Sequence, residues 1–278
     1  MELHDLPADT GPERYSGGYS AHVLGGLSRR TAEREAAFYL PYLRAGMRLL
    51  DCGCGPGSLT VDLAQRVAPG AVVGLDLEAD QFALAEARAR ERGARNVTFR
   101  QGSLYELPFE DGAFDAVFAH AVLYHLSRPE RALEEICRVL APGGVVGLRD
   151  WDFAGDVWHP ALPEVDRAMQ LAARTVTHLG GNPAFGRTQQ AALRAAGFEV
   201  VGLSASSEVF SAHDRAPGFA KYWADHFLVE HTELIQQEGW ATETELAYVR
   251  DGLHRWGAHP DAFYARCRCE AVARKPEA

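Results

Sequence analysis

Three glycines, Gly53, Gly55 and Gly57, lie between an apolar run, "MRLLD", and a helical pattern, "SLTVDLAQRV". Glycine tolerates positive φ angles, and it lets a ligand approach the backbone without meeting a Cβ atom. Ligands of open parallel sheets bind beyond the carboxyl ends of the strands, where such loops lie. The triplet therefore suggests a ligand site, although a purely structural turn would also explain it.

The spacing of the glycines restricts the ligand. The loop reads GxGxG, with Pro56 inside it and Ser58 after it, so the dinucleotide pattern GxGxxG is missed by one residue. A phosphate-binding P-loop would need Gly-Lys-Ser/Thr, and the loop contains no lysine. These differences disfavour nicotinamide dinucleotides and nucleoside triphosphates.

A second signal is Asp76, which ends the apolar run "AVVGLDL". A carboxylate after the second strand of a nucleoside-binding sheet accepts hydrogen bonds from ribose hydroxyls. Alone, Asp76 would also suit the N-cap of the next helix. A third signal, "FRQGSLYELPFEDGAFDAV", places Gly102, Ser103 and Leu104 at the end of another strand. The three signals together favour a nucleoside site.

Composition excludes several classes of function. The chain has 278 residues, 47% of them hydrophobic, and a formal charge of −10. Nucleic-acid binding needs clustered basic residues, so the acidic balance predicts no nucleic-acid partner. No apolar stretch reaches the length of a membrane span, and the acidic N-terminus does not resemble a signal peptide.

The five cysteines indicate reduced thiols in the cytoplasm. They include two CxC pairs, Cys52/Cys54 and Cys267/Cys269, whose spacing differs from the CxxC usual at zinc sites. We therefore expect no metal site.

Strand and helix patterns alternate from residue 47 to residue 150, which predicts a parallel sheet with helices on both faces. Residues 31–43 also look helical. Ser127 and Glu130 form a possible capping box, with Pro129 in the first turn of a helix that Gly143 and Gly144 would end. Residues 198–210 and 262–275 read as further strands. The alternation of the last one, with Arg266, Arg268 and Glu270 on one side, predicts a half-exposed face on an edge or antiparallel strand.

At this point the sequence resembles the class I S-adenosylmethionine-dependent methyltransferases, especially small-molecule enzymes such as the ubiquinone/menaquinone C-methyltransferases. The resemblance covers roughly residues 30–150. It rests on four segments in order: "LLDCGCGPG", "VVGLDL", "QGSLYELPFEDGAFDAVFA" and "RVLAPGGVV". It implies an α/β, Rossmann-like fold with a seven-stranded, mostly parallel sheet whose last strand is antiparallel, and with helical insertions after strands 5 and 6.

The resemblance also implies a set of cofactor contacts. Asp51, Gly53 and Gly55 would meet the amino-acid half of S-adenosylmethionine, and Asp76 its ribose. Leu77, Gln81, Gly102, Ser103 and Leu104 would surround the adenine, and His120 would lie beneath the sulfonium. An N-terminal arm and helix, residues 1–45, would cover the site through Tyr15, Tyr19 and Arg30, although packing of the arm also explains the two tyrosines. The product would be S-adenosylhomocysteine.

Methyl transfer from a sulfonium is an in-line displacement, which needs a general base only if the acceptor must lose a proton. His120, Tyr124 and His125 follow the fourth strand and are the candidates for catalysis. Each has a structural alternative: orientation of the cofactor, packing, or capping of the next helix.

The acceptor is less defined. Aromatic and acidic residues around Trp151 would suit an apolar or cationic acceptor, unless the tryptophans only seat an insertion on the sheet. Residues 46–278 would form the methyltransferase domain, with helical insertions at about 151–197 and 213–260. The second insertion carries Phe219, Tyr222, Trp223, His226 and Phe227 at helical spacing, which is typical of core packing. It could be a lid or the surface of a homo-oligomer.

The sequence thus predicts methylation of a small organic acceptor at carbon, oxygen or nitrogen. A catalytically silent nucleoside-binding module is the main alternative. A nicotinamide-dependent oxidoreductase is a weaker one.

Overall fold

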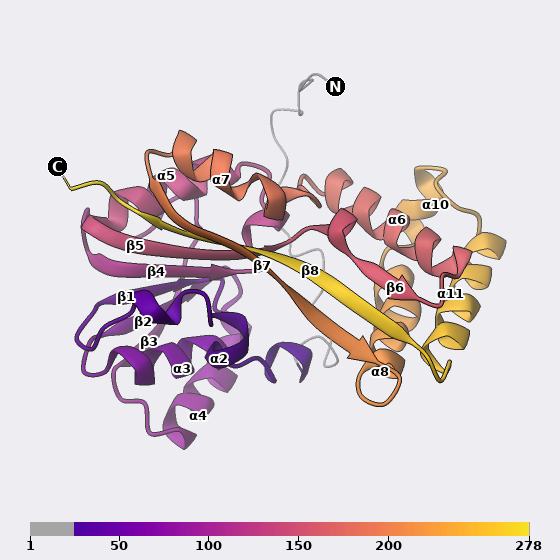
Figure 1. Cartoon of the computed structure of the whole chain (residues 1–278), viewed down its shortest axis with the longest axis horizontal. Helices are drawn as coiled ribbons and strands as arrows, with labels where there is room; N and C mark the ends of the chain where they lie inside the picture. Colours follow the sequence, from indigo (N-terminus) through magenta and orange to yellow (C-terminus); the bar gives the residue numbers. More distant parts are fainter. Residues whose placement is uncertain (1–24, 278) are drawn as a thin grey trace.

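The computed structural model describes residues 25–277, through which a mixed eight-stranded sheet runs (Figure 1). The strand order is β3-β2-β1-β4-β5-β8-β6, with β7 also paired to β8. Strands β1 to β5 are parallel to one another, and β8 is antiparallel to its neighbours β5, β6 and β7. The strands are β1 (Leu49–Cys52), β2 (Val72–Asp76), β3 (Val97–Gln101), β4 (Phe114–His120), β5 (Leu140–Trp151), β6 (Val157–His159), β7 (Glu199–Ser211) and β8 (Phe263–Arg274).

Helices cover both faces of the parallel half and form a separate group beside β6 (Figure 1). The α-helices are α2 (Ala32–Glu35), α3 (Ser58–Val67), α4 (Phe82–Glu91), α5 (Pro129–Val139), α6 (Pro163–His178), α7 (Phe185–Ala195), α8 (Ala216–Lys221), α9 (Leu228–Glu230), α10 (Thr232–Gln237) and α11 (Glu243–Gly257). Short 3₁₀ turns are η1 (Leu40–Tyr42), η2 (Ala79–Gln81), η3 (Leu123–His125) and η4 (Phe153–Gly155), while η5 (Tyr222–Phe227) is π-helical. Among the described helices, none is long and apolar enough to cross a membrane.

Neighbouring residues of each strand belong to two different hydrophobic cores. Leu49 packs in the cluster under α3, whereas Leu50 packs in the cluster that contains α5 and α7. Side chains alternate between the faces of a sheet, so a strand covered on both faces must be apolar throughout. All four residues of β1 are buried, as this arrangement requires. The predicted doubly covered α/β sheet is thereby confirmed.

The prediction of seven strands is wrong by one. The additional strand, β6, pairs with residues 263–265 of β8, beyond the point where β5 stops pairing with the same strand at Arg268. After β5 the chain leaves the edge of β8 through η4, and it then pairs with β8 again over the three residues of β6. The first insertion therefore contains a short strand as well as α6 and α7, and the second follows β7.

The last strand is antiparallel, as predicted, but its polar side is not half-exposed. β8 lies between β5 and β7, which occupy its two edges. Arg268 is only 2% exposed, and Glu270 is also buried. A charged face inside the protein must find partners there, because a buried unpaired charge is costly.

Two other local predictions are wrong. Residues 31–43 form only α2 and η1 rather than one helix. Helix α5 has Arg128 as its N-cap without a side-chain cap, while the Ser127 hydroxyl lies 3.3 Å from the Tyr105 hydroxyl. Pro129 is in the first turn as expected, but α5 ends at Val139, ahead of Gly143 and Gly144.

Candidate active site

A first cavity, which we call the strand-end cavity, lies where β1, β2, β3 and β4 end. Its volume is about 120 Å³. Most of the residues predicted to contact a nucleoside border it. Its lining residues are Leu27, Arg30, Gly53, Gly55, Leu75, Asp76, Leu77, Gln81, Gly102, Leu104, His120, Ala121, Val122, His125 and Leu126.

The glycine loop is shaped by positive φ angles and by a close approach to the loop after β4. Gly53 has φ +72°, and a Cβ atom there would lie 2.4 Å from Cγ2 of Val122. Gly55 has φ +50°, and its amide donates a 2.8 Å hydrogen bond to Oδ2 of Asp76. Only glycine fits at position 53 without displacing Val122. The glycine therefore allows the loop after β1 to pack closely against the loop after β4.

Asp76 is held in place by backbone amides. Besides Gly55, the amide of Glu78 donates to its Oδ1 at 3.0 Å. Burial raises the pKa of Asp76, and the backbone hydrogen bonds oppose that rise. A half-buried carboxylate with a fixed orientation at the end of β2 is suited to accept hydrogen bonds from a pair of ligand hydroxyls.

Two further polar atoms at the strand-end cavity have no hydrogen-bond partner within residues 25–277. They are Oε1 of Gln81 and Nδ1 of His120, both on buried side chains. Buried polar groups are almost always hydrogen-bonded, so such atoms suggest that a polar ligand completes the site. The lining residues thus fit a nucleoside with a polar attachment.

His120 is held by a charged pair beneath the cavity. Its Nε2 lies 2.8 Å from Nη1 of Arg149 and 3.3 Å from Oε2 of Glu35. Because a guanidinium only donates, Nε2 accepts from it and the proton is on Nδ1. Burial and the positive charge of Arg30 lower the pKa of His120 to about 3, against the opposing contact with Glu35. His120 is therefore neutral at physiological pH.

Several predicted residues lie elsewhere. Asp51 is buried and accepts a 2.6 Å hydrogen bond from the Thr60 hydroxyl of α3, while the Ser103 hydroxyl accepts one from the Tyr105 amide. Neither borders the strand-end cavity, and their contacts with a cofactor stay predictions. Tyr15 and Tyr19 lie outside the described residues.

A second and larger cavity, which we call the insertion cavity, lies between β7, β8 and the second insertion. Its volume is about 770 Å³. Aromatic rings and charged groups dominate its lining. The aromatic residues are Tyr124, Trp151, Phe153, Phe210, Phe219, Tyr222, Trp223 and Phe227; the charged ones are Arg29, Arg30, Arg34, Arg215, Arg266, Arg268, Glu35, Glu208 and Asp214.

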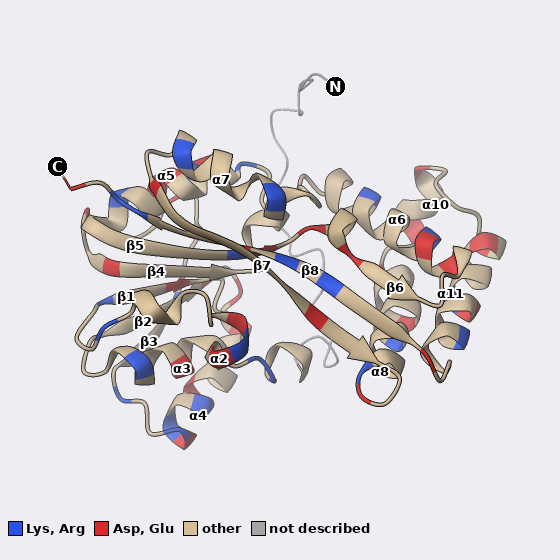
Figure 2. Cartoon of the chain, in the orientation of Figure 1, with Lys and Arg blue, Asp and Glu red and all other residues tan. Residues whose placement is uncertain are grey.

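Figure 2 shows basic positions of β8 beside an acidic position of β7, where the two strands run side by side. Oε2 of Glu208 lies 3.3 Å from Arg266 and 3.5 Å from Arg268, and its Oε1 lies 3.1 Å from Arg215. Burial and the neighbouring Arg266 lower the pKa of Arg268 to about 10, so it remains charged at neutral pH. The Glu208 carboxylate thus forms ion pairs with three guanidinium groups.

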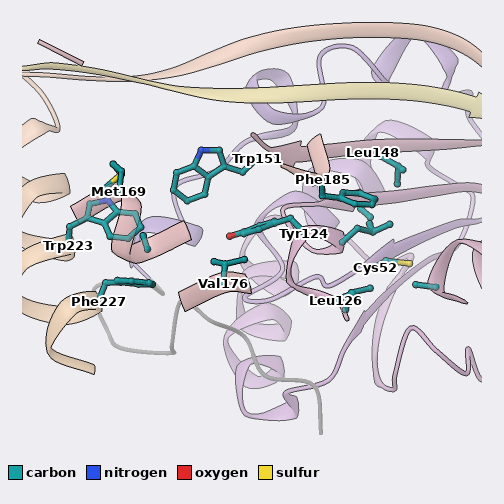
Figure 3. Close-up of a cluster of buried hydrophobic side chains, with 14 of the residues drawn as sticks. Cys52, Tyr124, Leu126, Leu148, Trp151, Met169, Val176, Phe185, Trp223 and Phe227 are labelled. Carbon is teal, nitrogen blue, oxygen red and sulfur yellow. The ribbon is translucent and has the colours of Figure 1, made fainter. Parts of the chain in front are cut away.

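The aromatic side chains come from both the sheet and the second insertion. Figure 3 shows the Tyr124 hydroxyl pointing toward the insertion residues Trp223 and Phe227. The expectation that this aromatic run forms core is correct only in part, since Trp223 and Phe227 are buried and also line the cavity. They belong to the π-helical segment η5, a conformation often found at functional sites.

The two cavities meet at the end of β4. Leu27, Arg30 and Ala121 border both of them. Ala121 has φ +58°, which makes it the one described residue other than glycine with a positive φ. Strained backbone of this kind persists where the surroundings impose it, and it clusters at functional sites.

Sequence reasoning missed the charged part of the site. The roles of Glu35, Arg149, Glu208, Arg266 and Arg268 were not predicted. The signal for two of them was present in the alternation of residues 263–270, but that pattern was interpreted as a solvent-facing surface. No group of three or more possible metal ligands occurs in residues 25–277.

Comparisons with known proteins agree with this geometry. The family described as "Methyltransferase domain" matches residues 43–192. The chain is 31% identical to "Probable methyltransferase ltbC" of Aspergillus luteorubrus, over 96% of this chain and 100% of that one. It is 37% identical to the demethylmenaquinone methyltransferase of Lactococcus lactis, over 47% of this chain and 50% of that one.

Among solved structures, that of the [4+2]-cyclase SpnF is similar, with 29% identity and a TM-score of 0.51. The match covers 93% of this chain and 82% of that one. The family match spans more than half of the chain, and the similarity to ltbC extends over nearly all of it. With the glycine loop, the carboxylate after β2 and the antiparallel β8, these matches show that the chain belongs to the class I S-adenosylmethionine-dependent methyltransferases.

Proposed function

We propose that this methyltransferase methylates a small organic acceptor that binds in the insertion cavity. The observation that carries the proposal is the junction of the two cavities at Ala121, Leu27 and Arg30. A cofactor in the strand-end cavity and an acceptor in the insertion cavity would meet there. Alignment of two bound reactants can lower a barrier by roughly 7–11 kcal/mol.

The cofactor supplies an electrophilic methyl group. In this proposal Asp76 accepts hydrogen bonds from its ribose hydroxyls, Leu77 and Leu104 contact its adenine, and the glycine loop meets its amino-acid end. Gln81 and His120 provide the polar atoms that lack partners in residues 25–277.

The proton-accepting groups near the junction are weak bases. Burial and the charges of Arg268 and Arg30 lower the pKa of His125 to about 3, as burial and Arg30 do for His120. Neither histidine is suited to deprotonate an acceptor with a much higher pKa. Of the three predicted catalytic residues, Tyr124 borders the insertion cavity, where it can position the acceptor. We therefore propose that catalysis depends on alignment and exclusion of water more than on a histidine base.

The segment before β1 contributes to the domain organisation that we propose. The carbonyl of Leu27 accepts from the Ser58 hydroxyl at 2.8 Å, and that of Ser28 accepts from Arg88 at 2.9 Å. These bonds fasten residues 27–30 over the glycine loop. They support a role of residues 1–45 as a cover and of residues 46–278 as the methyltransferase domain.

All five cysteines are free thiols, which agrees with the expected reducing cytoplasm.

The first test is a thermal-shift series with S-adenosylmethionine, S-adenosylhomocysteine and NADH. A ligand at 100 times its Kd stabilises the fold by about 2.7 kcal/mol. We expect a shift with the two sulfur nucleosides and none with NADH. A shift with NADH alone would contradict the cofactor assignment.

Product mass then distinguishes the reaction classes. Incubation with candidate acceptors and S-adenosylmethionine should add the mass of one methyl group to the product. The similarity to a [4+2]-cyclase makes ring closure the specific second candidate, and it would leave the acceptor mass unchanged. Binding of the cofactor without turnover of any acceptor would favour a silent binding module.

A further inference from the structure

The insertion cavity contains more cationic than anionic groups, although the chain as a whole is acidic. Six arginines and three acidic residues line it, in a protein with a formal charge of −10. On the side of β7 and β8, Arg215, Arg266 and Arg268 share Glu208, and Arg215 also pairs with Asp214. Local charge opposite in sign to the net charge of a protein indicates electrostatic recognition of a ligand.

Two acidic groups behind the cavity take their hydrogen bonds from donors other than Arg266 and Arg268. Both oxygens of Asp156 accept from the Trp151 indole, and the Tyr264 hydroxyl and the Cys267 amide also donate to this carboxylate. Glu270 is bound by Arg149 and by two serine hydroxyls of β7. Asp150 is buried and does not border the cavity. The carboxylates of Asp156 and Glu270 therefore already have donors of their own.

Several guanidinium atoms, in contrast, lack acceptors. Nε of Arg266, and Nε and Nη1 of Arg268, are buried without a hydrogen-bond partner among the described residues. Arg268 is 2% exposed and borders the cavity. Leaving a buried donor unsatisfied is unfavourable, more so when the group is charged. An anionic oxygen ligand would satisfy donors that Glu208 cannot reach.

The aromatic rings argue against a cationic ligand. The guanidinium of Arg266 lies 4.4 Å from the centroid of Trp151, and that of Arg215 lies 4.4 Å from the centroid of Phe210. The protein's own cations therefore already occupy a face of Trp151 and a face of Phe210, which a cationic acceptor would otherwise use. Trp223 and Phe227, both buried, also line the cavity.

From this arrangement we infer that the acceptor is an aromatic or similarly apolar organic acid, whose carboxylate binds Arg266 and Arg268 while its apolar body lies among Tyr124, Trp151 and Trp223. The inference rests on the proposed function and narrows its substrate class. A carboxylate fits because its two oxygens match the planar donors of a guanidinium.

Calorimetric titration of the full-length protein tests this inference with three probes of one shape: 2-naphthoate, the uncharged 2-naphthamide, and the cationic 2-(aminomethyl)naphthalene. Each is titrated with and without saturating S-adenosylhomocysteine. We expect 2-naphthoate to bind at least about tenfold more tightly than the amide, and the amine to bind most weakly. Equal affinity for acid and amide, preference for the amine, or no binding of the acid would overturn the inference.

Variants locate the carboxylate. Arg266→Gln and Arg268→Gln should each reduce the preference for 2-naphthoate to less than threefold. Arg194→Gln, on the exposed surface of α7, should leave it unchanged. Preserved preference in both cavity variants would overturn the assignment of these arginines. If they do not fold, the comparison of the three probes on the wild-type protein still decides.

The two hypotheses fail separately. Absence of S-adenosylhomocysteine binding would contradict the proposed function, whereas its binding without a carboxylate preference would contradict only the acceptor class.

Discussion

The strand-end cavity and the insertion cavity are built in different ways. The first takes most of its lining from residues 53–126, at the ends of four neighbouring strands, and its specific contacts use backbone amides and one carboxylate. The second combines side chains from residues 26–35, from the ends of β4 and β5, and from β7, β8 and the second insertion. A cavity whose contacts come from the backbone can bind the same ligand while the surrounding side chains are substituted. A cavity built from side chains on separate elements can change its ligand without changing the fold.

The largest effect should follow from removing the acid that Arg215, Arg266 and Arg268 share. Glu208→Gln leaves three guanidinium groups without their shared carboxylate, and breaking a buried ion pair costs about 3 kcal/mol. We expect Tm to fall by several degrees in thermal unfolding. Because the lost charge is replaceable by an anion, millimolar 2-naphthoate should restore part of the loss. Glu243→Gln, which removes an exposed ion pair with Arg250, is the control and should cost less than about 1 kcal/mol.

The next largest effect concerns the other cavity. Asp76→Asn should weaken binding of S-adenosylmethionine by about 2 kcal/mol, or roughly thirtyfold, because hydrogen bonds to a charged group are lost. Isothermal titration should show this loss while the affinity for 2-naphthoate stays the same. Asp80→Asn, at an exposed position in η2, should bind the cofactor normally. Unchanged affinity of Asp76→Asn would contradict the ribose assignment, and parallel loss of both ligands would contradict the independence of the two cavities.

A third pair of variants, His125→Gln and Asp51→Asn, tests how two titratable side chains make the free energy of unfolding depend on pH. Burial and the charges of Arg268 and Arg30 lower the pKa of His125 to about 3 in the folded state. As pH falls, His125 is therefore protonated in the unfolded chain before it is protonated in the folded protein. The stability that neutral His125 contributes is present above pH 6.5 and is lost as pH falls toward 3. His125→Gln should therefore unfold less readily than the wild type on acidification, by up to about 1.4 kcal/mol per pH unit.

Asp51 should show the opposite dependence. Burial raises its pKa to about 7, with the charge of Asp76 adding to the rise and the Thr60 hydroxyl opposing it. The folded state then holds this proton more tightly, and the associated stability is lost as pH rises from 3.8 through 7. Asp51→Asn should lose less stability with rising pH than the wild type does. Denaturant titrations between pH 5 and pH 8 measure both slopes, and slopes of the same sign would contradict the assignment.

The smallest effect is expected where the cavities meet. Ala121→Gly should relieve the positive φ and raise the unfolding free energy by up to about 1 kcal/mol, less the entropy that glycine adds to the unfolded chain. Ala121→Val should lower it, because a β-branched residue is more strained there. Thermal unfolding distinguishes them. If the glycine variant is less stable than the wild type, the strain at Ala121 is not significant.

The same contrast explains what the sequence could predict. Apolar runs and glycines report directly on covered strands and tight turns, so the parallel half, the loop at Gly53 and the position of Asp76 followed from local pattern. Asp51 shows a limit, because a residue at a strand end can face the cavity or α3, and only the packing with Thr60 decides. Arg266 and Arg268 show another. Their alternation was visible, but whether a polar side of a strand faces solvent or an internal cavity depends on β7, some 60 residues earlier in the chain.

The register of β8 has a consequence for the size of the acceptor. Arg268 lies opposite Trp151 at the end of β5, and Arg266 lies two positions farther from the sheet centre on the same face. Side chains on one face of a strand recur every two residues. The positions of β8 at which an arginine would face the cavity are therefore spaced by roughly 7 Å. The length between the charged group of an acceptor and its methylated atom would then be selected in discrete increments, set by the strand rather than by the helices around it.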